Sequence, residues 1–175
     1  MTLTRPQDVL ILLKLIASPE SGATYARLAE ETGLSTSQVY RSLERAETAR
    51  LYVSSRRSPV RAAFLPFVLY GVPHAFPAVP GGRTRGMPTS IAAPPLDAQF
   101  NVSPLAASGE IPVWPYAEGT ASGYAVEPLH SAAPFAALQD SALYELLALV
   151  DALREGRARE RAMASDALSQ RLAYA

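Results

Sequence analysis

Apolar and polar residues alternate with helical spacing at the start of the chain. The run from Val9 to Ile16 is apolar around most of a helical circumference, which predicts a helix buried on nearly all sides. Thr4 and Gln7 have the spacing of a capping box for this helix. A second helix is predicted over 24–31. It ends at Gly33, because glycine best adopts the left-handed turn that follows a helix.

The third predicted helix runs from Ser35 to about Ala49, and Ser35 with Gln38 forms another capping box. Its apolar residues recur at i, i+4 and i+7 and should face inward: Val39, Leu43 and Ala46. The opposite face is polar and consists of Ser37, Arg41, Glu44 and Thr48, flanked by Tyr40 and Arg45. The helix is therefore amphipathic and should lie on the protein surface.

A short strand is predicted over 51–53, followed by a polar turn over 54–58. Ser58 and Pro59 are suited to begin a fourth helix that extends to Gly71. Pro66 within that stretch favours a break or a late start, because proline lacks the amide hydrogen that a helix interior requires.

The segment from Leu28 to Leu43 has the residue types of a helix-turn-helix. Such a motif needs a small residue where its helices cross, a glycine in the turn, and apolar residues that hold the second helix on the first. These positions are occupied by Ala29, Gly33, Leu34 and Val39. The segment resembles the winged helix-turn-helix regulators, MarR-like ones among them, over roughly residues 5–62.

This resemblance implies that the helix over 35–49 reads the major groove of double-stranded DNA and that a hairpin wing follows it. The candidate DNA-binding residues are Thr36, Ser37, Gln38, Tyr40, Arg41 and Arg45 on the helix and Arg56 and Arg57 in the wing. Gln38 is suited to adenine and Arg41 to guanine. The alternative for Arg41 and Arg45 is ion pairing with nearby glutamates on a solvated helix face. Where these regulators often have glycine before the first wing strand, this chain has Arg50, so the left-handed turn there is expected to be reshaped.

Charge is distributed unevenly along a chain whose formal net charge is zero. Residues 1–61 carry nine Lys or Arg and six Asp or Glu, whereas residues 62–175 carry seven and ten. The first part therefore has a balance of +3 and the second of −3. This asymmetry indicates that the two parts meet different partners.

The middle segment, residues 71–135, contains 11 Pro and 7 Gly. It also contains many large apolar residues, so we expect an ordered, mostly irregular segment with a few short strands. The stretch from Pro80 to Ser90 is read first as a plain connecting loop. A contact to DNA or to a partner, and a nest for a small anion formed by its glycines and arginines, are the alternatives.

Helical spacing returns from about Ser141. The apolar stripe comprises Leu143, Leu146, Leu147, Val150 and Leu153, and a more polar helix is predicted over 158–172. The two form a helical hairpin or one kinked helix. The stripe must be buried, either in the core of the chain or across a homodimer interface, and we predict the interface. The alternating charges over 154–161 indicate a solvated face or a contact with a second protein.

The residue inventory argues against several classes of function. The chain has no cysteine and two histidines, His74 and His130, which we expect to be satisfied structural or surface side chains. The carboxylate pairs Glu30/Glu31 and Asp151/Glu155 are read as ordinary helix-face charges, so neither an enzyme nor a metal or cofactor site is expected. No membrane span or signal peptide is visible, which predicts a cytoplasmic protein.

The sequence therefore predicts a mainly α protein with a small β wing. Residues 1–70 form a winged helix-turn-helix, 71–140 an ordered irregular segment, and 141–175 a pair of helices for dimerisation or partner binding. The predicted function is that of a sequence-specific DNA-binding transcriptional regulator, a repressor. The alternative is a protein-interaction module, such as a winged-helix antitoxin that neutralises a partner protein and represses its own operon.

Overall fold

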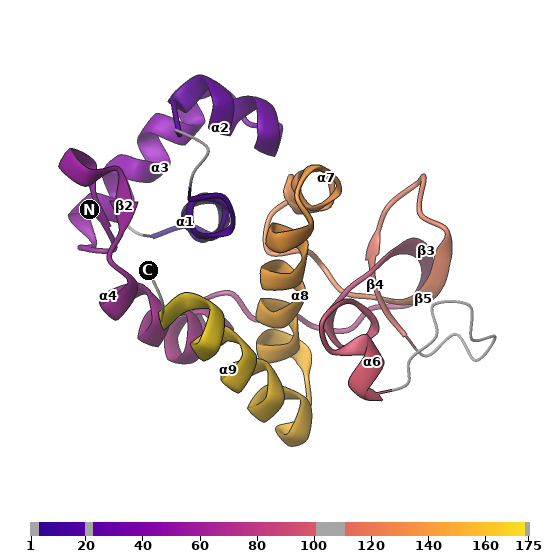
Figure 1. Ribbon diagram of the computed structural model, residues 1–175. Coiled ribbons are helices and arrows are strands. Elements are labelled where there is room, and N and C mark those ends of the chain that lie inside the picture. The colour runs from indigo at the N-terminus through magenta and orange to yellow at the C-terminus, as the bar shows by residue number, and fades with distance from the viewer. Residues whose placement is uncertain (1–3, 20–22, 101–110, 174–175) are drawn as a thin grey trace.

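The computed structural model describes residues 4–19, 23–100 and 111–173 and is mainly helical (Figure 1). The first part contains α1 (Pro6–Ala17), α2 (Tyr25–Thr32), α3 (Thr36–Thr48), β1 (Tyr52–Val53), η1 (Ser54–Arg56) and β2 (Ser58–Pro59). A helical stretch follows, comprising α4 (Arg61–Pro66), η2 (Phe67–Gly71) and α5 (Val72–Ala75). The middle part contains β3 (Arg83–Pro88), η3 (Ser90–Ala92), α6 (Asp97–Phe100), β4 (Pro112–Pro115) and β5 (Ala121–Ala125). The last part contains α7 (Ala133–Gln139), α8 (Ser141–Glu155) and α9 (Ala158–Ala173).

The start of α1 differs from the predicted capping box of Thr4 and Gln7. The backbone N–H of Arg5 donates to Oδ2 of Asp8 at 2.9 Å, so Asp8 closes the first turn. Gln7 points to α3 instead, where its Nε2 donates to Oγ of Ser42 at 2.7 Å. A side chain predicted to cap its own helix therefore connects α1 to α3.

The predicted ends of α2 and α3 are confirmed. Gly33 follows α2 with φ of 72°. Oγ of Ser35 accepts from the N–H of Gln38 at 3.2 Å, and Oε1 of Gln38 accepts from the N–H of Ser35 at 2.9 Å. The three predicted inward residues of α3 are all buried: Val39, Leu43 and Ala46. The local pattern thus determines both the limits of α3 and the face that it buries.

The helix α1 lies between α3 and α8, with its residues from Asp8 to Ile16 all buried (Figure 1). The apolar residues of α8 complete this core. Each residue of the predicted stripe is at most 4% exposed: Leu143, Leu146, Leu147, Val150 and Leu153. The prediction that this stripe forms a homodimer interface is therefore wrong, because the chain itself covers the stripe.

The helical stretch from Arg61 to Ala75 continues through Pro66, although a break was expected there. The backbone relaxes into a π-helical turn over Phe67–Gly71, directly after the proline. Beyond this stretch, α8 and α9 are two separate helices, as predicted, and α9 packs against both α8 and α4.

The middle segment forms a small sheet in which three strands close on one another. The strand β3 pairs antiparallel with both β4 and β5, and β4 pairs parallel with β5. The reading of Pro80 to Ser90 as a plain loop is therefore wrong. Gly86 of β3 permits the tight closure, because a Cβ there would lie only 1.8 Å from the carbonyl oxygen of Trp114. Gly81 donates its N–H to the carbonyl of Ala125 at 2.7 Å, so that amide is engaged in pairing and does not form an anion nest.

Candidate nucleic-acid interface

The turn between α2 and α3 is held from both inside and outside. Inside, Ala29 and Leu34 are buried in the main hydrophobic core. Outside, the Phe135 ring of α7 lies against Gly33, since a Cβ on that glycine would lie 2.9 Å from Cδ1 of the ring. The C-terminal part of the chain thus contacts α2 and the turn that follows it.

One side of α3 faces solvent. Its exposed residues are Thr36, Ser37, Gln38, Tyr40, Arg41, Glu44, Glu47 and Thr48. We call this set the α3 face. It includes five of the six residues of this helix that the sequence predicted as DNA contacts.

Arg41 is an exposed arginine of the α3 face. Its side chain makes no hydrogen bond or ion pair within residues 4–19, 23–100 and 111–173. The pairing with Glu44 that the sequence suggested is not formed, and Oε1 of Glu44 accepts from the hydroxyl of Tyr40 at 2.9 Å. That hydrogen bond raises the pKa of Tyr40. Arg41 therefore presents an unengaged guanidinium to solvent.

Arg45 does not belong to the α3 face. Its Nη2 lies 2.6 Å from Oδ1 of Asp8, and its Nε donates to Oδ2 of the same carboxylate at 3.0 Å. Asp8 has no exposed surface, and only 14% of the Arg45 side chain is exposed. A buried carboxylate of this kind needs a cation beside it. Arg45 is therefore withdrawn from the candidate DNA contacts.

Two further polar residues of the α3 face are partly committed to the fold. Oε1 of Gln38 is used in the capping box, which leaves its Nε2 as the group free to contact DNA. Oγ of Ser37 lies 3.1 Å from Oγ of Ser35. A two-point contact from Gln38 to adenine would thus break the cap, which counts against the predicted pairing.

The β1–β2 hairpin stands next to the end of α3. Its register pairs Tyr52 with Pro59 and Val53 with Ser58. Glu47 joins the hairpin to α3, because its Oε1 accepts from both the N–H and the hydroxyl of Ser54, at 3.0 and 2.6 Å. These two hydrogen bonds lower the pKa of Glu47.

Three arginines around the hairpin are exposed: Arg50, Arg56 and Arg57. Arg50 has φ of 60°, so the left-handed turn before β1 is present even though arginine replaces the usual glycine. The expectation that this turn is reshaped is therefore wrong. The side chains of Arg56 and Arg57 make no hydrogen bond or ion pair with any residue that the structure describes.

An ion cluster around the buried Lys14 links α1, α2 and α8. Nζ of Lys14 lies 2.8 Å from Oε2 of Glu31 and 2.7 Å from Oδ2 of Asp140, and only 4% of the lysine side chain is exposed. The hydrogen bond from Lys14 lowers the pKa of Glu31. Burial alone would raise the pKa of Asp140, but the hydrogen bonds from Lys14, Ser18 and the Leu143 amide outweigh it and lower that pKa. The position of α2 is therefore coupled to the start of α8.

The sequence suggested that Asp151 is an ordinary helix-face charge. That interpretation is wrong, because Asp151 is fully buried. Oδ2 accepts from the Trp114 indole and from Thr89, and Oδ1 pairs with Nη1 of Arg154 at 2.7 Å. Glu155 is half-buried and accepts from Ser90 at 2.6 Å. Burial raises the pKa of both carboxyls. The network fixes the three-stranded sheet to α8. A buried tryptophan usually needs an acceptor for its indole N–H, so Trp114 was the sequence signal that could have indicated this network.

The two histidines are structural or surface side chains in this fold. His74 is exposed, and Nδ1 of His130 accepts from the N–H of Ala132 at 3.1 Å. Burial lowers the pKa of His130. Among the residues that the structure describes, no three His, Cys, Asp or Glu side chains gather in a way that could hold a metal ion. In the same ranges no helix is both long and apolar enough to cross a membrane.

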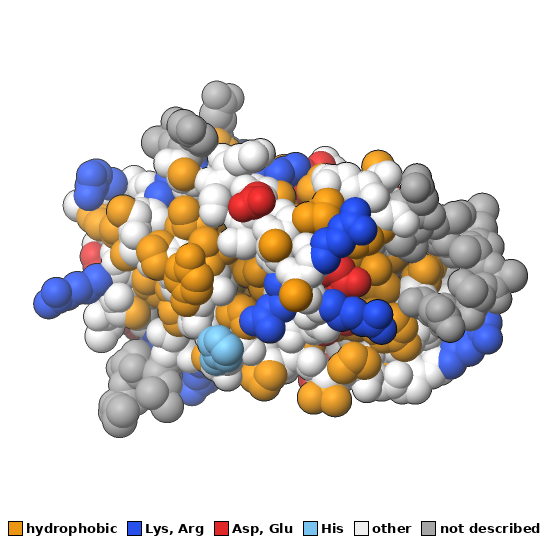
Figure 2. Space-filling view, turned by 90° about the horizontal axis from the view of Figure 1, so that it is seen from below, with side chains coloured by type: hydrophobic (Ala, Val, Ile, Leu, Met, Phe, Trp, Pro, Cys, Tyr) orange, Lys and Arg blue, Asp and Glu red, His pale blue; other side chains and the backbone are white. Residues whose placement is uncertain are grey.

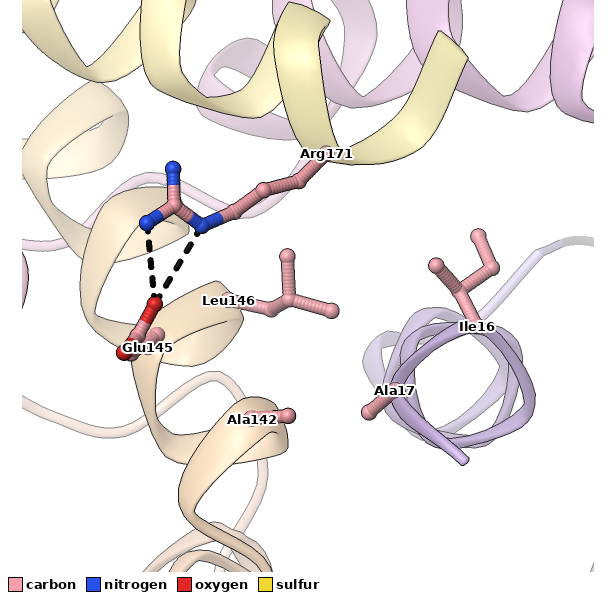
Figure 3. Close-up of a pocket in the computed structure, with 6 residues that line it drawn as sticks. All are labelled: Ile16, Ala17, Ala142, Glu145, Leu146 and Arg171. Atoms are coloured by element: carbon pink, nitrogen blue, oxygen red, sulfur yellow. Dashed lines mark hydrogen bonds and ion pairs between the residues drawn. The ribbon is translucent and has the colours of Figure 1, made fainter. Parts of the chain in front are cut away.

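A crevice of about 190 Å³ opens where α1 ends against α8 and α9 (Figure 3). Apolar side chains line it: Ile16 and Ala17 from α1, and Ala142 and Leu146 from α8. At its side, Nη2 of Arg171 pairs with Oε2 of Glu145 at 2.9 Å. Because these two charges satisfy each other and the remaining lining is apolar, the crevice is a gap in helix packing and lacks groups that would orient a polar ligand.

The exposed side of α9 has mixed charge. Arg157, Arg159 and Arg161 are exposed, and Oε2 of Glu160 accepts from the N–H of Arg157 at 2.7 Å. The guanidinium of Arg159 lies 5.4 Å from the centroid of the Phe100 ring. Figure 2 views the molecule from below and shows basic, acidic and hydrophobic side chains interspersed on that side. These features agree with a solvated face.

Comparisons with known proteins returned no match to a protein-family model, to a curated protein or to a solved structure. The functional argument therefore depends on the geometry of the α3 face and the hairpin.

Proposed function

We propose that the protein binds double-stranded DNA sequence-specifically and regulates transcription, as a repressor. In this proposal α2, α3 and the β1–β2 hairpin act as a winged helix-turn-helix. The observation that carries the proposal is the exposed α3 face, on which Arg41 has no partner among the described residues while the opposite side of α3 is buried. An unpaired arginine on a solvent-facing helix after a tight glycine turn is suited to a base edge in the major groove.

The roles of the arginines follow from their partners. Arg41 contacts a guanine, and Arg56 and Arg57 contact backbone phosphates beside it. Arg45 supports the helix from behind through Asp8. Thr36 and Ser37, at the exposed start of α3, make the remaining polar contacts with the DNA. A single helix of this size reads only a few base pairs, so two copies occupy related half-sites, and their contact does not use the buried stripe of α8.

The competing use of the α3 face is binding to another protein. Tyr25 and Tyr40 are 43% and 47% exposed and pack edge to face, with ring centroids 5.8 Å apart. Glu44 and Glu47 on the same face would repel phosphates. Exposed aromatic residues beside carboxylates favour a protein partner, such as the toxin of an autoregulating toxin–antitoxin pair.

Affinity for DNA selected from a random pool distinguishes the two uses. The Arg41→Ala variant should weaken specific binding by roughly 1–3 kcal/mol and relax preference at one base pair. Arg83→Ala is the matched control, because Arg83 is an exposed arginine on β3. Equal losses on every sequence would make Arg41 a phosphate contact, and unchanged affinity in the Arg41 variant would remove α3 from the DNA interface.

A further inference from the structure

A cleft of about 410 Å³ separates the end of α1 from the β1–β2 hairpin. It is lined by α1 and the chain after it, by the hairpin tip and by the start of α4, and no residue of α3 contributes. The cleft is therefore separate from the α3 face, although both use the hairpin.

Three arginines line this cleft: Arg56, Arg57 and Arg61. None of the described lining residues is acidic. Nη1 of Arg61 donates to the backbone carbonyls of Arg171 and Leu172 at 3.3 and 3.2 Å, which orients its guanidinium without neutralising its charge. Three like charges around one cleft repel each other, so a bound anion would relieve that repulsion.

The backbone at Arg57 adds a second observation. Arg57 has φ of 48°, a left-handed conformation that glycine or asparagine adopts with less strain. Its N–H closes the hairpin tip by donating to the carbonyl of Ser54 at 3.1 Å. The turn thus holds an arginine side chain at the rim of the cleft at some conformational cost, as strained residues at binding sites do.

The remaining lining indicates the chemistry of the ligand. Ser58 supplies a hydroxyl group, and Leu15 and Pro59 supply apolar wall. A phosphate group offers up to two negative charges and three acceptor oxygens, and it matches several arginines better than a carboxylate does. The apolar wall suits an organic group attached to that phosphate.

We propose that this cleft binds a small organic phosphate. The ligand also opposes DNA binding, because Arg56 and Arg57 cannot contact it and the DNA backbone at the same time. This regulatory consequence rests on the proposed function, whereas binding of the phosphate itself does not.

Titration of the full chain with phenyl phosphate tests the binding site, with the arginine Nε–H signals followed by nuclear magnetic resonance. We expect saturable shifts, weaker binding of inorganic phosphate, and no shift with phenol. The Arg61→Gln variant removes the charge but retains a donor for the two carbonyls of α9. It should weaken phenyl phosphate binding roughly tenfold. The matched control Arg83→Gln should bind like the unaltered chain, and circular dichroism verifies that each variant is folded.

Three outcomes would overturn the proposal: no saturable shift, equal binding by the folded Arg61→Gln variant, or tighter binding of benzoate than of phenyl phosphate. Duplex DNA provides the other source of phosphate. If DNA shifts the Arg61 signal and phenyl phosphate does not, the cleft holds a backbone phosphate and the small-molecule assignment is wrong.

The regulatory consequence has its own test. DNA affinity is measured with phenyl phosphate and with sodium chloride at equal ionic strength. Phenyl phosphate should lower the DNA affinity of both chains, but Arg61→Gln should need a roughly tenfold higher concentration for the same effect. If the chain binds phenyl phosphate but no duplex DNA, the phosphate site is supported and the proposed function is refuted. If bound phenyl phosphate does not change the DNA affinity, only the proposed regulation is refuted, and the phosphate site remains.

Discussion

The guanidinium of Arg45 lies 2.6 Å from the buried carboxylate of Asp8, across the contact between α3 and α1. The same guanidinium donates to Oγ of Ser42 at 3.1 Å. The pair therefore locates α3 on α1 and determines which of the two arginines on α3 is available to a partner molecule.

Loss of this ion pair should destabilise the fold. The Arg45→Ala variant leaves the carboxylate of Asp8 buried without a cation, which typically costs about 3–5 kcal/mol of the free energy of unfolding. Urea denaturation gives the value. The matched control Arg41→Ala should stay within about 0.5 kcal/mol of the unaltered chain, because Arg41 is exposed. Equal stability of the two variants would show that the Asp8 pair does not support α3.

A side chain in the turn between α2 and α3 should destabilise the fold. The Gly33→Ala variant places a Cβ in a left-handed conformation, at a cost of about 1–2 kcal/mol, and forces it against the Phe135 ring. The clash part of that cost should disappear when the ring is removed. In a double-mutant cycle by chemical denaturation, Gly33→Ala with Phe135→Ala should therefore cost less than the sum of the single variants. Strict additivity would mean that α7 does not press on the turn.

The elements near the start of the chain were predictable because their signals are local. Gly33 and the capping box of Ser35 with Gln38 fix where α2 ends and α3 begins, and both are readable within a few residues. The buried side of α3 follows from its apolar spacing in the same way. Tertiary contacts were needed only to hold these elements together.

The remainder depends on residues far apart in the sequence. Lys14 and Asp140 are 126 residues apart, so no local pattern indicated that the start of α8 binds α1. The same limit applies to Arg45, whose partner Asp8 is 37 residues away. An apolar stripe such as that of α8 shows that burial is needed but not what covers it, and the covering surface proved to be the same chain.

The hairpin arginines should contribute affinity without specificity. Replacing Arg56 and Arg57 together by glutamine should reduce the slope of log affinity against log salt concentration by about two, with little change in base preference. The matched control replaces Arg83 and Arg85, two exposed arginines of β3. A salt slope that does not change in the hairpin variant would remove the β1–β2 hairpin from the DNA interface.

Acid should weaken the link between α1 and α8. The pKa of Asp140 is lowered below its ordinary value of 3.8, so its stabilising contribution is present above that value and is lost as the pH falls through the folded-state pKa. The Asp140→Asn variant should therefore be less stable by about 1–3 kcal/mol at pH 7, and the difference should shrink as the pH falls below about 4. Thermal denaturation across pH measures it. A difference that stays constant from pH 7 to pH 3 would exclude the charge of Asp140 as the cause.

Selection of bound duplexes from a random pool, performed with the purified full chain, tests the central claim most directly. The account predicts an enriched motif with a guanine contacted by Arg41, and the Arg41→Ala variant should lose information at that base pair while the rest of the motif persists. A pool that shows no enrichment with a folded chain would contradict sequence-specific DNA binding through α3.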